Sequence, residues 1–313
     1  MPFELIAHGV FSFVSGVSVA ITGFGCDSAR ELFAELSTGP NAYPASSAIN
    51  MGLSAALVTA VQAALQRRVI HGGLLLNTLP WTFIGVVLSL NVFSAAVLAA
   101  LVPAVGACLL GLSLAKLWME LADRRHKASV RDGDDDGRRG ANSWKWTGVL
   151  VVASIAGGLL SGRCPPPGPV FMVLLLASGE GVNVGGGEWR ATAALVTCSS
   201  SLLRVGLLLL ENGASAGPLS EVSVLVVGGL VGVAAGNFAL RVLSSSGGDN
   251  GSEERRIPRP AAFRRCVLAV ALTTSAAMAV GGPPAALASV SRPVVLGTLA
   301  VVCVVAAAGA LWG

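Results

Sequence analysis

Single charges set into long apolar stretches are the residues of this chain that could do chemistry. Arg163 is followed by Cys164 and three prolines, Pro165–Pro167, within the segment SGRCPPPGPV at 161–170. Proline donates no backbone N–H and disfavours α geometry in the residue before it, so a helix that reaches this segment must end. An arginine in an apolar segment needs an anionic partner, and a bound anion is one candidate. The alternative is an ordinary turn with Arg163 in water.

A second interruption is predicted at ITGFGCDSAR, residues 21–30, where Gly23 and Gly25 flank Phe24. Glycine lets the backbone turn at such a point. Helix N-termini that face a site between two breaks favour an anion, because they present free N–H groups and the positive end of the dipole. Asp27 and Glu31 follow this break and are the candidates for proton coupling. In the second segment, Gly162, Pro166 and Gly168 are the corresponding candidates for shaping the backbone around the solute.

Two further arginines are candidates for contact with an anion. Arg190 and Thr192 open the apolar helix that follows the second break. The alternative for Arg190 is an anchor at the membrane surface beside Trp189. Arg204 lies deep in the same helix, where a charge usually faces the protein interior or an aqueous path. Its alternative is a structural ion pair with one of three acids, Asp27, Glu31 or Glu211.

The elements that must position these residues are transmembrane helices. Hydrophobic residues make up 53% of the 313-residue chain and charged residues only 12%, about half of the share that covers a soluble domain. The net charge of +4 is too small to suggest nucleic acid. The six cysteines are scattered and close to no histidine, which indicates neither a metal site nor a disulfide framework.

Stretches near the roughly 20 residues that a spanning helix needs are predicted at 8–25, 44–66, 72–90, 93–118, 147–162, 190–211, 219–243, 264–281 and 293–312. A shorter apolar run covers 169–179, and residues 26–36 are amphipathic, so that the sequence leaves open whether they cross. The charged loops at 119–145 and 244–263, together with Arg67 and Arg68, are predicted to be cytoplasmic by the positive-inside rule. Gly228, Gly232 and Gly236 form a GxxxGxxxG face, which indicates internal close packing.

The two halves of the chain resemble each other at one common offset. VSG at 14–16 matches LSG at 160–162, and PASSA at 44–48 matches RATAA at 190–194. NVFSAAVL at 91–98 matches NFALRVL at 237–243 at the same offset of about 146 residues. We therefore expect an all-α polytopic bundle of about 8–10 spans, built from two homologous repeats with broken helices. The expected units are a first repeat at 1–118, the loop 119–145, a second repeat at 146–281 and an extra C-terminal helix within 282–313.

At these breaks the chain resembles the TauE/SafE family of membrane permeases, often described as sulfite or organosulfonate exporters. FVSGVSVAITGFG at 13–25 followed by YPASSAINMG at 43–52 looks like the family's first copy, and IAGGLLSGRCPPPGPVFMVLLLASG at 155–179 followed by RATAALVTCSSSLL at 190–203 looks like the second. LPWTFIGVVLS at 79–89 is similar to the fourth segment of such permeases. The family's triple glycine is absent from both copies.

The resemblance implies a secondary transporter that moves small anions of the sulfite or sulfonate type by alternating access. An ion gradient would supply the energy, because no Walker-type motif is present. We expect no enzyme activity, cofactor or metal, and the partners to be the anionic solute and the lipid bilayer. The alternative is a non-transporting membrane scaffold of the same fold that binds partners through its charged loops. The sequence does not indicate which membrane the protein occupies or its oligomeric state.

Overall fold

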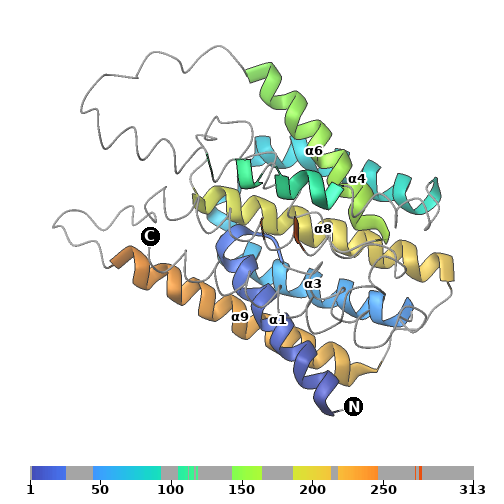
Figure 1. The fold of residues 1–313 in the computed structure, drawn as a ribbon, viewed down its shortest axis with the longest axis vertical. Coiled ribbons are helices and arrows are strands. Elements are labelled where there is room, and N and C mark those ends of the chain that lie inside the picture. The colour runs from blue at the N-terminus through green and yellow to red at the C-terminus, as the bar shows by residue number, and fades with distance from the viewer. Residues whose placement is uncertain are drawn as a thin grey trace.

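The computed structural model describes residues 2–25, 45–92, 105–111, 113–115, 118, 143–163, 186–212, 218–245, 272, 275 and 276. This part of the chain is helical and holds no strand. Its elements are α1 (Pro2–Thr22), α3 (Ala45–Leu65), the short 3-10 helix η1 (Arg67–Val69), α4 (Gly72–Asn91), α6 (Ser143–Arg163), α8 (Gly186–Asn212) and α9 (Leu219–Ser245), as Figure 1 shows. The prediction of an all-α chain is confirmed for these residues.

Most helices occupy the predicted stretches, with shifts at their ends. α6 begins at Ser143, inside the predicted loop 119–145, and α8 begins at Gly186 rather than at 190. Both helices therefore begin several residues before their apolar stretch. The first turn of α8 includes the polar residue Glu188. The predictions for 26–36, 169–179, 264–281 except 272, 275 and 276, and 293–312 lie outside the described residues.

Within the described residues, four helices are long and apolar enough to cross a membrane. They cover Ala48–Leu65, Gly72–Asn91, Glu188–Leu210 and Leu219–Val242. α1 and α6 contain shorter apolar runs, at His8–Thr22 and Leu150–Leu159. A membrane core of about 30 Å needs about 20 helical residues, so the four longer helices are consistent with a membrane protein.

The helices pack in neighbouring pairs (Figure 1). α1 lies along α9, α4 lies along α6, and α3 packs against α8 between these pairs. α3 also contacts α9, and α4 also contacts α8. Gly52 lies against Val205, whereas Thr59 lies beside Cys198, so α3 and α8 run antiparallel. The bonds Asn50–Glu221 and Gln62–Asn237 show that α3 and α9 run parallel.

Glycines bring the backbones of two helix pairs into direct contact. A Cβ placed on Gly16 of α1 would lie 2.0 Å from the carbonyl oxygen of Gly229, and one on Gly232 of α9 would lie 2.1 Å from that of Phe13. A Cβ on Gly158 of α6 would lie 2.1 Å from the carbonyl oxygen of Thr82 on α4. Close approach of this kind is how helices associate in lipid, where burial of apolar surface drives nothing. The prediction that the GxxxGxxxG face packs inside the protein is confirmed, and its partner is α1.

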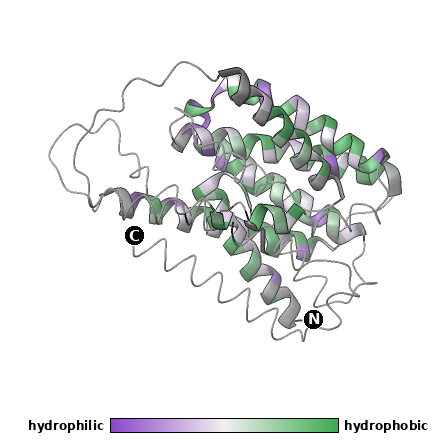
Figure 2. Ribbon diagram, turned by 45° about the horizontal axis from the view of Figure 1, so that its top comes forward, coloured by the Kyte–Doolittle hydropathy of each residue, from purple (hydrophilic) through white to green (hydrophobic). Residues whose placement is uncertain are grey.

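The bundle carries apolar side chains on its outer surface and many polar ones inside. Leu76, Leu210 and Phe238 are at least 69% exposed, whereas Asn50 and Gln62 are fully buried. The other buried polar side chains on these six helices are mostly hydroxyls, among them Ser12, Ser15, Ser18, Thr22, Ser54, Thr59, Thr78, Thr82, Ser89, Ser154, Ser161, Thr192, Thr197, Ser200 and Ser201. Hydrophobic residues occur along the length of the coloured helices in Figure 2. A water-soluble bundle shows the opposite arrangement.

Candidate functional site

The first predicted break lies at the C-terminal end of α1. Gly23 has a φ of +83° and its N–H donates to the carbonyl of Val19 at 2.8 Å, which is the left-handed glycine cap that ends many helices. The backbone beyond the cap is bonded to hydroxyls. Ser18 Oγ donates to the carbonyl of Phe24 at 2.8 Å, and the Phe24 N–H donates to Thr22 Oγ1 at 3.1 Å. These bonds allow a chain break to be buried without unsatisfied backbone groups.

Gly23 is pressed against the N-terminal part of α8. A Cβ at this position would lie 2.5 Å from the carbonyl oxygen of Arg190 and 2.7 Å from the Cβ of Ala193. In return, the Arg190 guanidinium donates from Nη1 to the carbonyl of Ala20 at 3.1 Å. A cation that bonds the last carbonyls of a helix also complements the negative end of its dipole. Arg190 therefore caps α1, a role that the sequence did not indicate.

Thr192 joins α8 to the start of α4. Its hydroxyl accepts the N–H of His71 at 3.0 Å and donates to the carbonyl of Glu188 at 2.8 Å. His71 is the N-cap of α4, because its Nδ1 accepts the N–H of Leu74 at 3.0 Å. Thr192 thus holds the ends of two helices together in this conformation.

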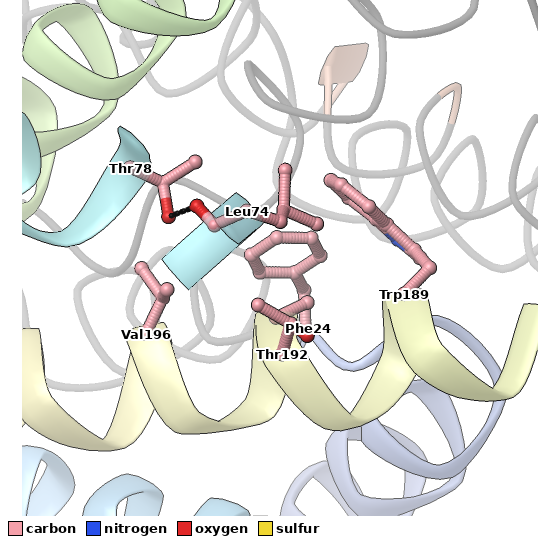
Figure 3. A pocket seen from close by; sticks show the side chains of 7 residues that line it. Phe24, Leu74, Thr78, Trp189, Thr192 and Val196 are labelled. Carbon is pink, nitrogen blue, oxygen red and sulfur yellow. Dashed lines mark hydrogen bonds between the residues drawn. The ribbon is translucent and has the colours of Figure 1, made fainter. Parts of the chain in front are cut away.

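A small, partly open pocket lies where these three helices meet (Figure 3). Its volume is about 10 Å³ and its lining consists of Phe24, Leu74, Thr78, Trp189, Thr192, Ala193 and Val196. The rings of Phe24 and Trp189 are 6.0 Å apart at an angle of 54°, an arrangement typical of stabilising aromatic pairs. Such a volume holds about one water molecule. Trp189 is buried in this corner of the bundle.

The structure thus brings Gly23, Phe24, Gly25, Arg190 and Thr192 together, as parts of one corner of the bundle. Arg204 lies elsewhere. It is 14 residues further along α8, about 21 Å at the helical rise, and only 5% exposed. Because it shares the helix but not the cavity, Arg204 belongs to a different level of the bundle.

For the remaining predicted site residues, the structure describes no side-chain position. Gly162 and Arg163 are the last residues of α6, and the description extends to their helical backbone. Pro166, Gly168, Asp27 and Glu31 lie outside the described residues. The structure therefore leaves the meeting of the two breaks as a prediction.

No group of three or more His, Cys, Asp or Glu side chains gathers in the described part of the chain. Cys108 and Cys198 carry free thiols there, the first exposed and the second buried.

Comparisons with protein-family models, with curated proteins and with solved structures find no match for this chain.

Proposed function

We propose that this chain is a multi-pass membrane transporter that moves a small anion by alternating access between two inverted repeats. The observation that carries the proposal is Arg204. This side chain is 5% exposed within the apolar span Glu188–Leu210. A charge at such depth costs at least ~2.5–3.5 kcal/mol on insertion scales, and in membrane proteins such charges mark solute or ion pathways.

Pairwise packing supports the repeats. At the offset of about 146 residues, α3 corresponds to α8 and α4 to α9, while α1 corresponds to α6. If each helix is replaced by its equivalent in the other half, the pair α1–α9 becomes α6–α4. The pair α3–α9 becomes α8–α4 in the same way. All four of these pairs are in contact. Individual contacts follow the same rule. Adding the offset to Gly52 gives Cys198, and adding it to Thr59 gives Val205. The contact of Gly52 with Val205 is therefore the equivalent of the contact of Thr59 with Cys198.

The antiparallel crossing of α3 and α8 supports inversion of one repeat relative to the other. Equivalent helices that run in opposite directions are related by an axis in the membrane plane, as in many secondary transporters. Such a protein reaches its two open states by rocking one repeat against the other around a central site.

The ends of the helices support an orientation in the membrane. Because α3 and α9 are parallel, Arg67 and Arg68 after α3 lie at the same end of the bundle as Ser245. The end of α8 and the start of α9 lie at the opposite end, and the connection 211–221 contains no Lys or Arg. This asymmetry agrees with a cytoplasmic location for the first end.

The solute path follows the interface of α4 and α8. Leu74 and Thr78 of α4 face Thr192 and Val196 of α8 across the cavity. Stepping four residues along α8 from Val196 leads to Ser200 and then Arg204, both buried. Phe24 and Trp189 close the path at its α1 end in this conformation. The sulfur oxyanion or sulfonate as solute rests on the resemblance of the two breaks to the TauE/SafE family.

Flux measurements on the purified chain in proteoliposomes test the proposal. The substitution Arg204→Gln keeps a polar side chain and removes the charge, while Arg241→Gln removes an exposed charge from the end of α9 as a matched control. A charged hydrogen bond contributes about 1.5–3 kcal/mol, so Arg204→Gln should slow sulfite flux by about 10–100-fold. The control should transport like the unmodified chain. If the unmodified chain moves neither sulfite nor sulfonates, the transport proposal is wrong and the scaffold alternative takes its place.

A further inference from the structure

The side-chain amide of Gln62 is buried with its donor group unused. The residue is fully buried on α3, and its Oε1 accepts the Asn237 N–H of α9 at 2.8 Å. Its Nε2 is also buried and has no hydrogen-bond partner in the described part of the chain. A buried donor without an acceptor is costly and uncommon in folded proteins. The Gln62 Nε2 therefore marks a position where a bound molecule can place an acceptor atom.

A second unpaired amide group lies one turn further along the chain. Gln66 follows Gln62 by four residues, and its backbone N–H donates to the Gln62 carbonyl at 3.2 Å. The two side chains therefore leave the helix on the same side. The Oε1 of Gln66 is buried and is not hydrogen-bonded by any described residue. Gln62 thus offers a donor and Gln66 an acceptor, so a ligand that satisfies both must carry an acceptor and a donor of its own.

The Gln62 amide lies at the level of the first break. One turn before it, α1, α3 and α9 meet in a cluster of three buried valines, Val19, Val58 and Val233. α1 and α9 run parallel, since the glycine contacts between them advance together along both helices, and α3 and α9 are parallel as well. A step of four residues from each valine therefore leads to Gly23, Gln62 and Asn237.

The charges at this end of the bundle favour an anion. Arg67 and Arg68 follow α3 directly, and Arg241 is the basic residue in the last part of α9. These three side chains are exposed, so water and salt screen their charges. Arg190 is half-buried and bonds the end of α1 at the break. α3 holds no charged residue, and the acid that α8 adds at this end is Glu188. The excess of positive charge favours a negatively charged ligand.

We propose that Gln62 and Gln66 bind an oxyanion that keeps a proton on one of its oxygens. Gln62 Nε2 donates to a charged oxygen of the anion, and the O–H of the anion donates to Gln66 Oε1. Asn237 positions the Gln62 amide through its own bond. Hydrogensulfite, the singly charged form of sulfite, carries both kinds of group, whereas a sulfonate carries acceptors alone. The inference rests on the proposed function for the choice of sulfite, while the requirement for a donor and an acceptor stands on the two amides.

Equilibrium binding to the full chain in detergent tests this site without a flux measurement. Isothermal titration calorimetry at mildly acidic pH gives the dissociation constants of sodium sulfite and sodium methanesulfonate, and a thermal scan checks that each variant is folded. The variants are Gln62→Leu and Gln66→Leu. Because Gln62→Leu leaves the Asn237 amide without its acceptor, a double variant that adds Asn237→Leu is measured beside it. Asn91→Leu is the matched control, because Asn91 is an exposed amide at the position equivalent to Asn237 in the first half.

The two anions should respond differently to the two glutamines. Gln62→Leu and the double variant should weaken the binding of both anions by about 10–100-fold, because each loses a hydrogen bond to a charged oxygen. Gln66→Leu should weaken sulfite binding about three- to tenfold and leave methanesulfonate unchanged, because methanesulfonate has no proton to donate. Asn91→Leu should bind both anions like the unmodified chain.

Three results overturn the site. The first is an unmodified chain that binds neither anion. The second is unchanged affinity in Gln62→Leu and in the double variant, which would assign the position to an ordered water only. The third is an equal loss of both anions in Gln66→Leu, because the acceptor role then fails. If binding depends on the amides as expected but no sulfite flux occurs in proteoliposomes, the site stands and the transport proposal is wrong. If sulfite flux occurs and binding is independent of the amides, the transport proposal stands and the site is wrong.

Discussion

Substitution of Gly23 by alanine measures how firmly the first break is held against α8. The left-handed backbone at φ +83° costs a non-glycine residue about 1–2 kcal/mol. The added Cβ would meet the Arg190 carbonyl oxygen at 2.5 Å, and relief of such overpacking costs about 1–3 kcal/mol. Alanine also makes the unfolded chain less flexible than glycine does, which stabilises the folded state by about 0.4–1 kcal/mol. The net loss in free energy of unfolding is therefore about 1–5 kcal/mol.

A thermal unfolding scan in detergent, followed with a thiol-reactive dye, gives the midpoint temperature. Domains of about 150–250 residues lose roughly 2–4 °C per kcal/mol, and a larger chain such as this one of 313 residues loses no more, so Gly23→Ala should lower the midpoint by about 2–20 °C. Gly206→Ala is the matched control, because Gly206 lies inside α8 and a Cβ there meets nothing within 4 Å. Alanine is the better helix former by about 0.5–1 kcal/mol, so the control should unfold at the same temperature or slightly above the unmodified chain.

The comparison separates a local effect from a general one. If Gly23→Ala unfolds at or above the temperature of the unmodified chain, the break is not pinned to α8 and the corner built on Phe24 and Arg190 is wrong. If the midpoint temperature of Gly206→Ala falls as far as that of Gly23→Ala, the loss reflects glycine-to-alanine substitution in general and not the contact at Gly23.

Two further substitutions probe the same packing. Phe24→Ala removes a ring that is 2% exposed and should cost about 3–5 kcal/mol of stability in the same scan. Phe238→Ala, at a ring that is 69% exposed, should change the stability by less than about 0.5 kcal/mol. Equal losses in the two variants would show that Phe24 is not packed. Gly158→Val drives a branched side chain toward the Thr82 carbonyl, 2.1 Å from the Cβ position, so it should reduce the monodisperse fraction in size-exclusion chromatography, while Gly148→Val, which meets nothing within 4 Å, should elute normally. A normal profile for Gly158→Val would refute the close contact of α4 with α6.

Local sequence determined where the long helices lie. α3, α4, α8 and α9 begin and end within a few residues of the predicted stretches, because the length of an apolar run and the helix breakers beside it are local properties. Gly23 likewise ends α1 as its backbone freedom predicts. The glycine spacing on α9 also predicted a close-packing face, since residues four apart lie on one side of a helix.

The tertiary structure decided which surfaces meet. These helices are apolar around most of their circumference, so periodicity did not reveal that α1 faces α9 or that α4 faces α6. The same limit explains Trp189, which packs on Phe24 inside the bundle, and Arg190, which caps α1. Asn50 and Glu221 are 171 positions apart, and neither carried a signal of its own. A contact between distant segments depends on the path of the whole chain, which local patterns do not encode.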